Sequence, residues 1–149
     1  IRAGADLIQI FDSWAGILGP EQYSEFALTY ISNICDAIKA KHPAVPITVF
    51  AKDAFFARKE INSINCNVVG LDWCMDPKES RLLIPNKTLQ GNMDPCALYA
   101  DYPELKKETE KMLSSFGTQK YIANLGHGLY PDIEADKVKF FIETVKNFR

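Results

Sequence analysis

The chain reads Tyr-Ile-Ala-Asn-Leu-Gly-His-Gly-Leu-Tyr-Pro-Asp over residues 121–132. The first five residues form a short apolar run typical of a buried strand, and a helical pattern begins after Pro131 and Asp132. His127 therefore lies between a strand and a helix, and a glycine on each side gives its imidazole little side-chain cover. In parallel α/β proteins, ligands bind at the carboxyl ends of the strands. This position favours a role for His127 in ligand binding.

Four similar units precede this one, and each is a short apolar run followed by a helical pattern. We expect strands at residues 7–11, 47–51, 68–71, 88–91 and 121–125. We expect helices from Pro20 to about Ile38, through Phe56, Glu60 and Ile61, and over residues 77–83, 103–116 and 136–148. Alternating strands and helices predict parallel pairing through right-handed crossovers.

Two α/β architectures fit this order of elements: an open doubly wound sheet, or part of a (β/α)8 TIM barrel. A doubly wound sheet that binds nucleotides has a glycine-rich phosphate turn, and the sequence contains neither GxGxxG nor GxxxxGK[ST]. We therefore favour a partial TIM barrel of about five C-terminal βα units, forming the C-terminal portion of a single barrel domain over residues 1–149. Residues 1–6 read as the end of a helix and a turn, without an initiating methionine, so we expect the chain to be a piece of a longer polypeptide whose N-terminal units are absent here.

Polar residues follow every expected strand, and together we call them the rim residues. They are Asp12, Ser13, Lys52, Asp53, Asp72, Trp73, Asn92, Asp94, Asn124 and His127. Aspartate and asparagine are also common in such turns because they cap helices, so the set as a whole fits a ligand site and capping equally well. Asp76 and Asp132 are expected to be caps. Ser13 and His127 are the better site candidates, because neither is an obvious cap, whereas His42 is expected to be solvated.

No residue pattern indicates covalent or metal catalysis. Ser13 lacks a GxSxG context, and the two histidines form neither HExxH nor HxH. Chemistry that depends on acid–base groups or polar positioning fits better. The four cysteines, Cys35, Cys66, Cys74 and Cys96, form no CxxC pair, and we expect reduced thiols packed in the interior of a protein from a cytosol-like compartment.

Composition excludes several partners. The chain is 47% hydrophobic with a net charge of −2, and its lysines are scattered, which argues against nucleic acid and against an anionic membrane surface. No apolar run approaches the roughly 20 residues that span a bilayer, so we expect a soluble protein with no membrane partner.

Five sequence blocks together strongly resemble the C-terminal half of the uroporphyrinogen decarboxylase family. They are Phe11-Asp12-Ser13-Trp14-Ala15-Gly16, Phe50-Ala51-Lys52-Asp53, Gly70-Leu71-Asp72-Trp73, Leu89-Gln90-Gly91-Asn92-Met93-Asp94-Pro95 and Asn124-Leu125-Gly126-His127-Gly128. The blocks occur in the order of that family and extend over nearly the whole chain.

The resemblance implies a cofactor-free and metal-free lyase of haem biosynthesis. Such an enzyme converts the four acetate side chains of uroporphyrinogen to methyl groups, giving coproporphyrinogen, on a TIM barrel that usually forms a homodimer. It also implies that Ser13 and His127 contact the substrate. The implied location is the cytoplasm, or a plastid if a targeting extension precedes residue 1.

The same resemblance places the family's arginine cluster, its essential aspartate and its substrate-contacting tyrosine in a part of the barrel that residues 1–149 do not contain. We therefore assign no catalytic residue in this chain and expect the fragment alone to be inactive. Two alternatives stay open. One is a non-catalytic porphyrinogen-binding module. The other is a related barrel methyltransferase that binds zinc through HxC and a later cysteine, although residues 89–92 and 124–127 lack the thiols and Cys96 is expected to be packed.

Overall fold

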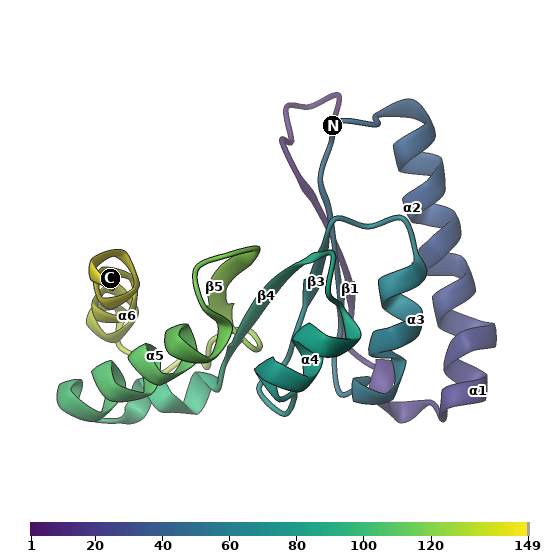
Figure 1. Cartoon of the computed structure of the whole chain (residues 1–149). Helices are drawn as coiled ribbons and strands as arrows, with labels where there is room; N and C mark the ends of the chain where they lie inside the picture. Colours follow the sequence, from purple (N-terminus) through teal and green to yellow (C-terminus); the bar gives the residue numbers. More distant parts are fainter. Residues whose placement is uncertain (149) are drawn as a thin grey trace.

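The computed structural model describes residues 1–148, which form one five-stranded sheet with helices beside it (Figure 1). All five strands are parallel and lie in the order of the chain. They are β1 Ile8–Asp12, β2 Ile47–Ala51, β3 Val68–Gly70, β4 Thr88–Met93 and β5 Tyr121–Leu125. Each expected strand is confirmed, with ends that differ by at most two residues.

The helices follow the expected pattern. They are α1 Pro20–Tyr23, α2 Thr29–Lys41, α3 Arg58–Ser63, α4 Pro77–Leu83, α5 Tyr102–Phe116 and α6 Ala135–Asn147. A π-helical turn over Ser24–Leu28 joins α1 to α2, so the helix expected from Pro20 is continuous. Short 3-10 helices occupy Ala15–Ile17, Phe55–Ala57 and Pro95–Tyr99. None of the helices in residues 1–148 has the length and apolar character needed to cross a bilayer.

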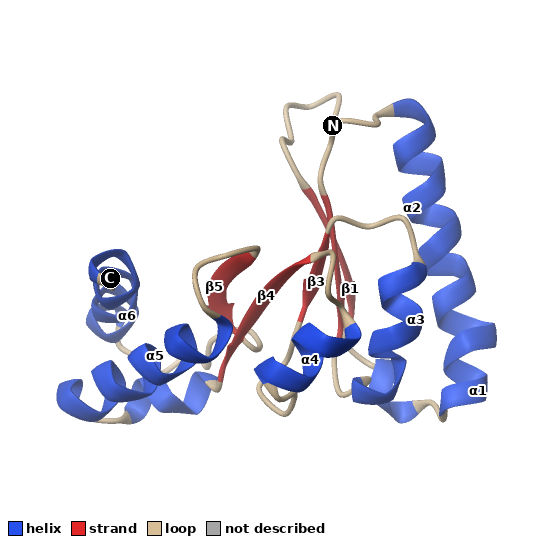
Figure 2. Cartoon of the chain, in the orientation of Figure 1, coloured by secondary structure: helices blue, strands red, loops and turns tan. Residues whose placement is uncertain are grey.

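The strand order is that of a barrel segment. In a doubly wound sheet the order reverses at a switch point, whereas here each strand pairs with the next one in sequence. Right-handed crossovers that always step in the same direction place their helices on one face of the sheet. In Figure 2, α1, α2 and α3 lie to the right of the strands, and α6 lies at the far left.

A contact between two glutamines shows that the sheet is curved. Gln9 lies on β1 and Gln90 on β4, with β2 and β3 between them. In a flat sheet these strands would lie roughly 14 Å apart, because neighbouring strands are about 4.8 Å apart and side chains stand roughly perpendicular to the sheet. The Gln90 Nε2 nevertheless donates to the Gln9 Oε1 at 3.5 Å. The sheet therefore bends toward the face that carries both side chains, as in a barrel wall.

Two apolar clusters lie between the sheet and the helices. The first includes the helix-facing residues of the central strands, Val49, Val69 and Leu89. The second includes Met93 with buried residues of α5 and α6, among them Leu105 and Phe141. Phe116, at the end of α5, packs against both clusters. The opposite, concave face of the sheet is left for a ligand.

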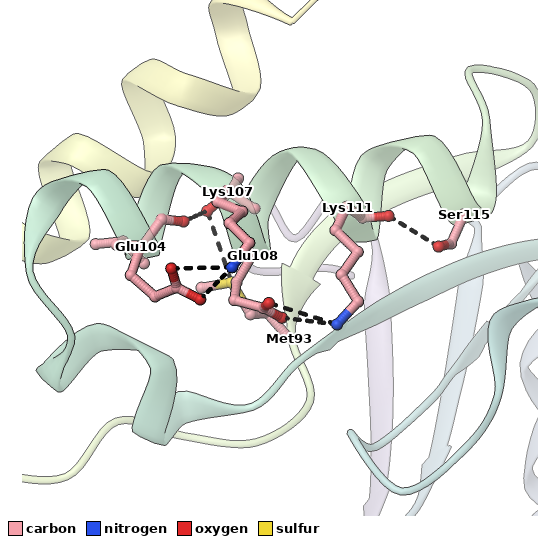
Figure 3. Close-up of polar contacts among 8 residues, drawn as sticks. Met93, Glu104, Lys107, Glu108, Lys111 and Ser115 are labelled. Carbon is pink, nitrogen blue, oxygen red and sulfur yellow. Dashed lines mark hydrogen bonds and ion pairs between the residues drawn. The ribbon is translucent and has the colours of Figure 1, made fainter.

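Helix α5 is held in place by the burial of the face that packs against the sheet. On the outer face, Figure 3 shows i,i+3 ion pairs: Lys107 with Glu104 at 2.9 Å and Lys111 with Glu108 at 3.2 Å. Exposed pairs of this kind contribute only about 0.5 kcal/mol or less. On the inner face, the buried Thr109 hydroxyl donates to the Leu105 carbonyl at 2.7 Å and lies 3.7 Å from the Met93 sulfur. The helix is therefore held against β4 mainly by burial of its inner face and only weakly stabilised by the exposed ion pairs.

One of the two expected helix caps is wrong. Asp76 does cap α4, since its carboxylate accepts from the Glu79 N–H at 2.7 Å. Asp132 does not cap α6, because that helix begins three residues later with Glu134 at the N-cap position and no side-chain hydrogen bond. Asp132 instead accepts from the Tyr99 hydroxyl at 2.6 Å. This hydrogen bond raises the pKa of Tyr99 to about 12.

The expectation of packed thiols holds for only half of the cysteines. Cys35 and Cys66 are buried, and burial raises the pKa of both, that of Cys35 to about 11. Cys74 and Cys96 are exposed, so the packed position expected for Cys96 is wrong. Cys96 lies in the first turn of a 3-10 helix, where its backbone N–H, rather than its thiol, is held by Asp94.

Two tyrosines, Tyr23 and Tyr121, allow a matched test of how their hydroxyl groups are placed in the interior. Tyr23 is 1% exposed, and its hydroxyl has no hydrogen-bond partner among residues 1–148. The Tyr121 hydroxyl donates to the Gly91 carbonyl. A buried unpaired hydroxyl is unfavourable, so we expect Tyr23→Phe to leave the free energy of unfolding unchanged or to raise it by up to about 1 kcal/mol. Tyr121→Phe should lower it by about 1 kcal/mol. Urea denaturation measures both, and a larger loss for Tyr23→Phe than for Tyr121→Phe would contradict this description.

Candidate functional site

A cleft of about 600 Å³ opens on the concave face of the sheet. Strand residues that share one face form its wall, since Phe11, Phe50, Gly70 and Gln90 lie side by side in the sheet register. Residues after β1 and β5 form its mouth, and α6 adds Val138, Phe141 and Ile142. The cleft lies where ligands bind in parallel α/β proteins.

Ser13 and His127 both line this cleft. They come from opposite ends of the chain, and the curvature of the sheet brings them to the same opening. Asn124, a third rim residue, lines the cleft as well. All three side chains are exposed and therefore accessible to a ligand. The structure thus brings together the two residues that the sequence predicts to bind substrate.

Alternation along β1 places Ser13. Gln9, Phe11 and Ser13 are two residues apart, and all three line the cleft, as expected for one face of an extended strand. The turn that follows packs closely on the neighbouring loop, because the Gly16 N–H donates to the Lys52 carbonyl at 2.9 Å. A Cβ at position 16 would lie 2.3 Å from the Cβ of Asp53, so only glycine fits there.

The loop after β5 holds His127 against Trp73. The Gly126 N–H donates to the Met93 carbonyl at 2.7 Å, and a Cβ at position 126 would lie 2.4 Å from the Trp73 backbone nitrogen. This close approach places the His127 ring edge-to-face with the Trp73 indole, with centroids 6.1 Å apart. Lys52 covers the same indole, with its Nζ 5.5 Å from the ring centroid. Trp73 therefore supports the histidine from the outside of the cleft.

Asp72 joins two of the loops at this end of the sheet to strand β4. It is completely buried, and its carboxylate accepts from the backbone N–H groups of Asp53 at 2.6 Å and Cys74 at 2.9 Å. The amide of Asn92 in β4, also buried, donates to the carbonyls of Asp72 at 2.8 Å and Met75 at 2.7 Å. Through these bonds the loops after β2 and β3 are held to each other and to the end of β4.

Most of the rim residues fall into two groups. Ser13, Asn124 and His127 face the cleft. Six others serve structure: Asp72 and Asn92 make buried hydrogen bonds, Asp94 caps the 3-10 helix, Lys52 pairs with Asp53, and Trp73 packs against His127. Asp12 belongs to neither group. The Lys52–Asp53 hydrogen bond raises the pKa of that lysine. Capping and loop bonding thus account for most of the polar residues at the rim.

The residues that line the wall of the cleft were missed by sequence reasoning. They include Gln9, Gln90 and the aromatic rings of Phe11 and Phe50. The sequence does mark the two glutamines as possible cleft residues, because each is a polar residue inside an apolar strand. No comparable signal marks the α6 residues, whose contribution depends on how the helix returns to the sheet.

The cleft has little charge. Its lining within residues 1–148 includes no lysine, arginine, aspartate or glutamate, so His127 is the ionisable side chain there. Among residues 1–148, one group of side chains outside the cleft could bind a metal ion, because oxygens of Asp53 and Asp72 and the Cys74 sulfur lie within 4.8 Å of one another. These carboxylates already accept from backbone N–H groups and from Lys52, and an ion would have to displace the lysine. The cleft therefore combines apolar walls with a few uncharged groups that can form hydrogen bonds.

The loop bonds of Asp72 can be tested against a capping aspartate. Asp72→Asn replaces an acceptor of two buried N–H groups with a group that also carries N–H donors, and we expect a loss of about 2–3 kcal/mol in the free energy of unfolding. Asp94→Asn keeps an acceptor for the Cys96 N–H, and asparagine caps as well as aspartate, so this control should change stability by less than about 0.5 kcal/mol. Equal effects in chemical denaturation would show that Asp72 does not join the loops.

Comparisons with known proteins identify the family of this chain. Residues 1–148 match the family model described as uroporphyrinogen decarboxylase. Relatives named uroporphyrinogen decarboxylase are 46% identical in Ovis aries, over 97% of this chain and 41% of the relative, and 44% identical in Danio rerio, over 99% and 42%. A bacterial relative of the same name, from Salinibacter ruber, is 42% identical over 97% and 41%. The chain thus spans about two-fifths of the length of these relatives.

A solved structure supports the fold alone. A methyltransferase from Methanosarcina mazei matches 97% of this chain and 43% of its own chain with a TM-score of 0.82, at 16% sequence identity. The family model and the relatives carry the assignment, and by them this chain belongs to the uroporphyrinogen decarboxylase family.

Proposed function

We propose that this chain supplies the C-terminal part of the substrate site of a uroporphyrinogen decarboxylase, which converts the four acetate arms of uroporphyrinogen to methyl groups with release of CO2. The observation that carries the proposal is that Ser13 and His127, from opposite ends of a chain of this family, line one cleft. In this proposal Ser13 and His127 bind the substrate, and residues 1–149 form the C-terminal portion of a single barrel domain.

The chemistry of the reaction suits such a site. When the bond to CO2 breaks, its electron pair must pass into the pyrrole ring, which therefore has to be protonated, and the methylene carbon that stays on the ring then takes up a proton to become the methyl group. A proton donor and groups that orient the carboxylates are needed. The Ser13 hydroxyl would donate a hydrogen bond to a carboxylate of the substrate. The His127 imidazole would do the same or, when protonated, add a positive charge.

Charge balance indicates that residues 1–149 are insufficient for turnover. The substrate carries many carboxylates, while the cleft lining in residues 1–148 contains no lysine or arginine. Two arginines of the chain are engaged in structure, since Arg58 binds Ser80 and Glu79, and Arg81 binds backbone carbonyls. The resemblance assigns the family's arginine cluster and essential aspartate to residues outside 1–149. The chain by itself therefore binds substrate without decarboxylating it.

The location and assembly of the whole protein belong to the same proposal. The family resemblance implies a cytoplasmic homodimer without a cofactor, or a plastid protein if a targeting extension precedes residue 1. A non-catalytic porphyrinogen-binding module is the second candidate, because it would use the same cleft. The residues upstream of Ile1 in the coding sequence distinguish the two, since an arginine cluster and a following aspartate would favour the enzyme.

The proposal is tested by anaerobic binding and turnover with the purified 149-residue chain. We expect calorimetry to detect binding of freshly reduced uroporphyrinogen, and chromatography to detect no coproporphyrinogen. His127→Gln should weaken binding about tenfold and Ser13→Ala about threefold to tenfold, the range for losing a hydrogen bond to a charged group or a neutral one.

Matched controls come from the same chain. His42→Gln and Ser114→Ala change the same residue types outside the cleft and should leave binding unchanged. Equal losses for His42→Gln and His127→Gln would contradict the assigned site. Product formation by the 149-residue chain would contradict the claim that it lacks the catalytic groups.

A further inference from the structure

Gln9 and Gln90 form a pair of side-chain amides in the wall of the cleft. Both are half-buried, and both line the cleft that holds Ser13 and His127 at its mouth. They reach each other across β2 and β3, where Gly70 has no side chain to separate them. Their neighbours in the wall are mainly apolar, among them Phe11 and Phe50.

Most of the hydrogen-bonding capacity of this pair is unused within residues 1–148. Two amides together offer four N–H donors and two carbonyl oxygens. Their mutual hydrogen bond, at 3.5 Å, is at the outer limit of length and uses one N–H and one of the two acceptor positions on one oxygen. Whichever glutamine donates, three N–H groups and acceptor positions on both carbonyl oxygens remain for a ligand. The pair can therefore still donate three hydrogen bonds into the cleft.

Three other amide side chains of the described residues are used for structure. Asn92 donates to two buried carbonyls, Asn67 accepts from the Ile47 N–H at 3.0 Å, and Asn65 donates to Asp36 at 3.2 Å. Gln9 and Gln90 differ from these three because they bind only each other and face the cleft, where Asn124 lies at the mouth. A few polar groups in an otherwise apolar pocket are typical of positions that orient a ligand.

We propose that Gln9 and Gln90 form a neutral donor site that binds one carboxylate arm of the polycarboxylated tetrapyrrole. The inference rests on the proposed function and adds to it a specificity-determining pair in the wall of the cleft. A carboxylate only accepts hydrogen bonds and has room for several, so it can take up all three of the remaining N–H groups. The apolar surroundings strengthen these hydrogen bonds by excluding water. The pair would therefore select an arm that ends in a carboxylate over one that ends in a methyl group.

The test introduces a negative charge at nearly constant shape. Gln90→Glu replaces the donor with a carboxylate of nearly the same size, and Gln90→Met removes polarity without adding charge. In calorimetry with freshly reduced uroporphyrinogen at pH 8, we expect binding to weaken at least tenfold for Gln90→Glu and about threefold for Gln90→Met. The control Gln119→Glu adds the same charge in the exposed turn before β5 and should leave binding unchanged. Gln9→Glu on β1 introduces the same charge at the other member of the pair if Gln90→Glu does not fold, as judged by circular dichroism.

The outcomes separate this inference from the proposed function. If the unmodified chain binds and Gln90→Glu binds as well as Gln90→Met or better, the amides accept from the ligand instead of donating to it, and the inference is wrong while the proposed function stands. The same conclusion follows if Gln90→Glu and Gln119→Glu weaken binding equally. If the unmodified chain does not bind uroporphyrinogen at all, the proposed function itself fails and the inference fails with it.

Discussion

The buried carboxylate of Asp72 is the interaction on which the cleft depends. It accepts two backbone N–H groups from two different loops, and the carbonyl of the same residue accepts from Asn92. A buried carboxylate is tolerated only when its oxygens are fully hydrogen-bonded, so these loops cannot move independently without exposing an unpaired charge. Gly16 and Gly126 then bring the two outer loops against this centre. Ser13 and His127 keep their relative positions because both are attached to the same rigid set of loops.

Polar residues at the ends of parallel strands thus have two distinct uses in this fold. The buried ones, Asp72 and Asn92, bind backbone groups and set the shape of the mouth, whereas the exposed ones that line the cleft remain available to a ligand. Trp73 connects the two groups of residues, since it contacts the structural residue Lys52 and the cleft residue His127. A change at a structural residue would therefore reach the ligand through the loops, even without direct contact.

The sequence predicts the repeated local elements well and the long-range contacts poorly. All five strands were predictable because short apolar runs between turn residues depend on local pattern, and Ser13 and His127 were predictable as residues that follow strands without a capping role. The capping role of Asp132 was predicted wrongly, because the helix starts later and Tyr99, distant in sequence, takes its carboxylate. The Gln9–Gln90 contact could not be predicted, since it depends on the curvature of the whole sheet. Sequence pattern also gave no means to separate Asp72 from the cleft-facing residues, because burial decides that difference.

Phe116 has a further consequence for how the molecule responds to stress. It touches both apolar clusters, and its ring stacks on Tyr121 of β5 with centroids 4.2 Å apart. Loss of packing in either cluster would remove part of the support of the other, so the two halves of the interior are thermodynamically coupled through one aromatic ring. Denaturation should then proceed as a single cooperative transition, with the last helix and the first strands losing their hydrogen-exchange protection together.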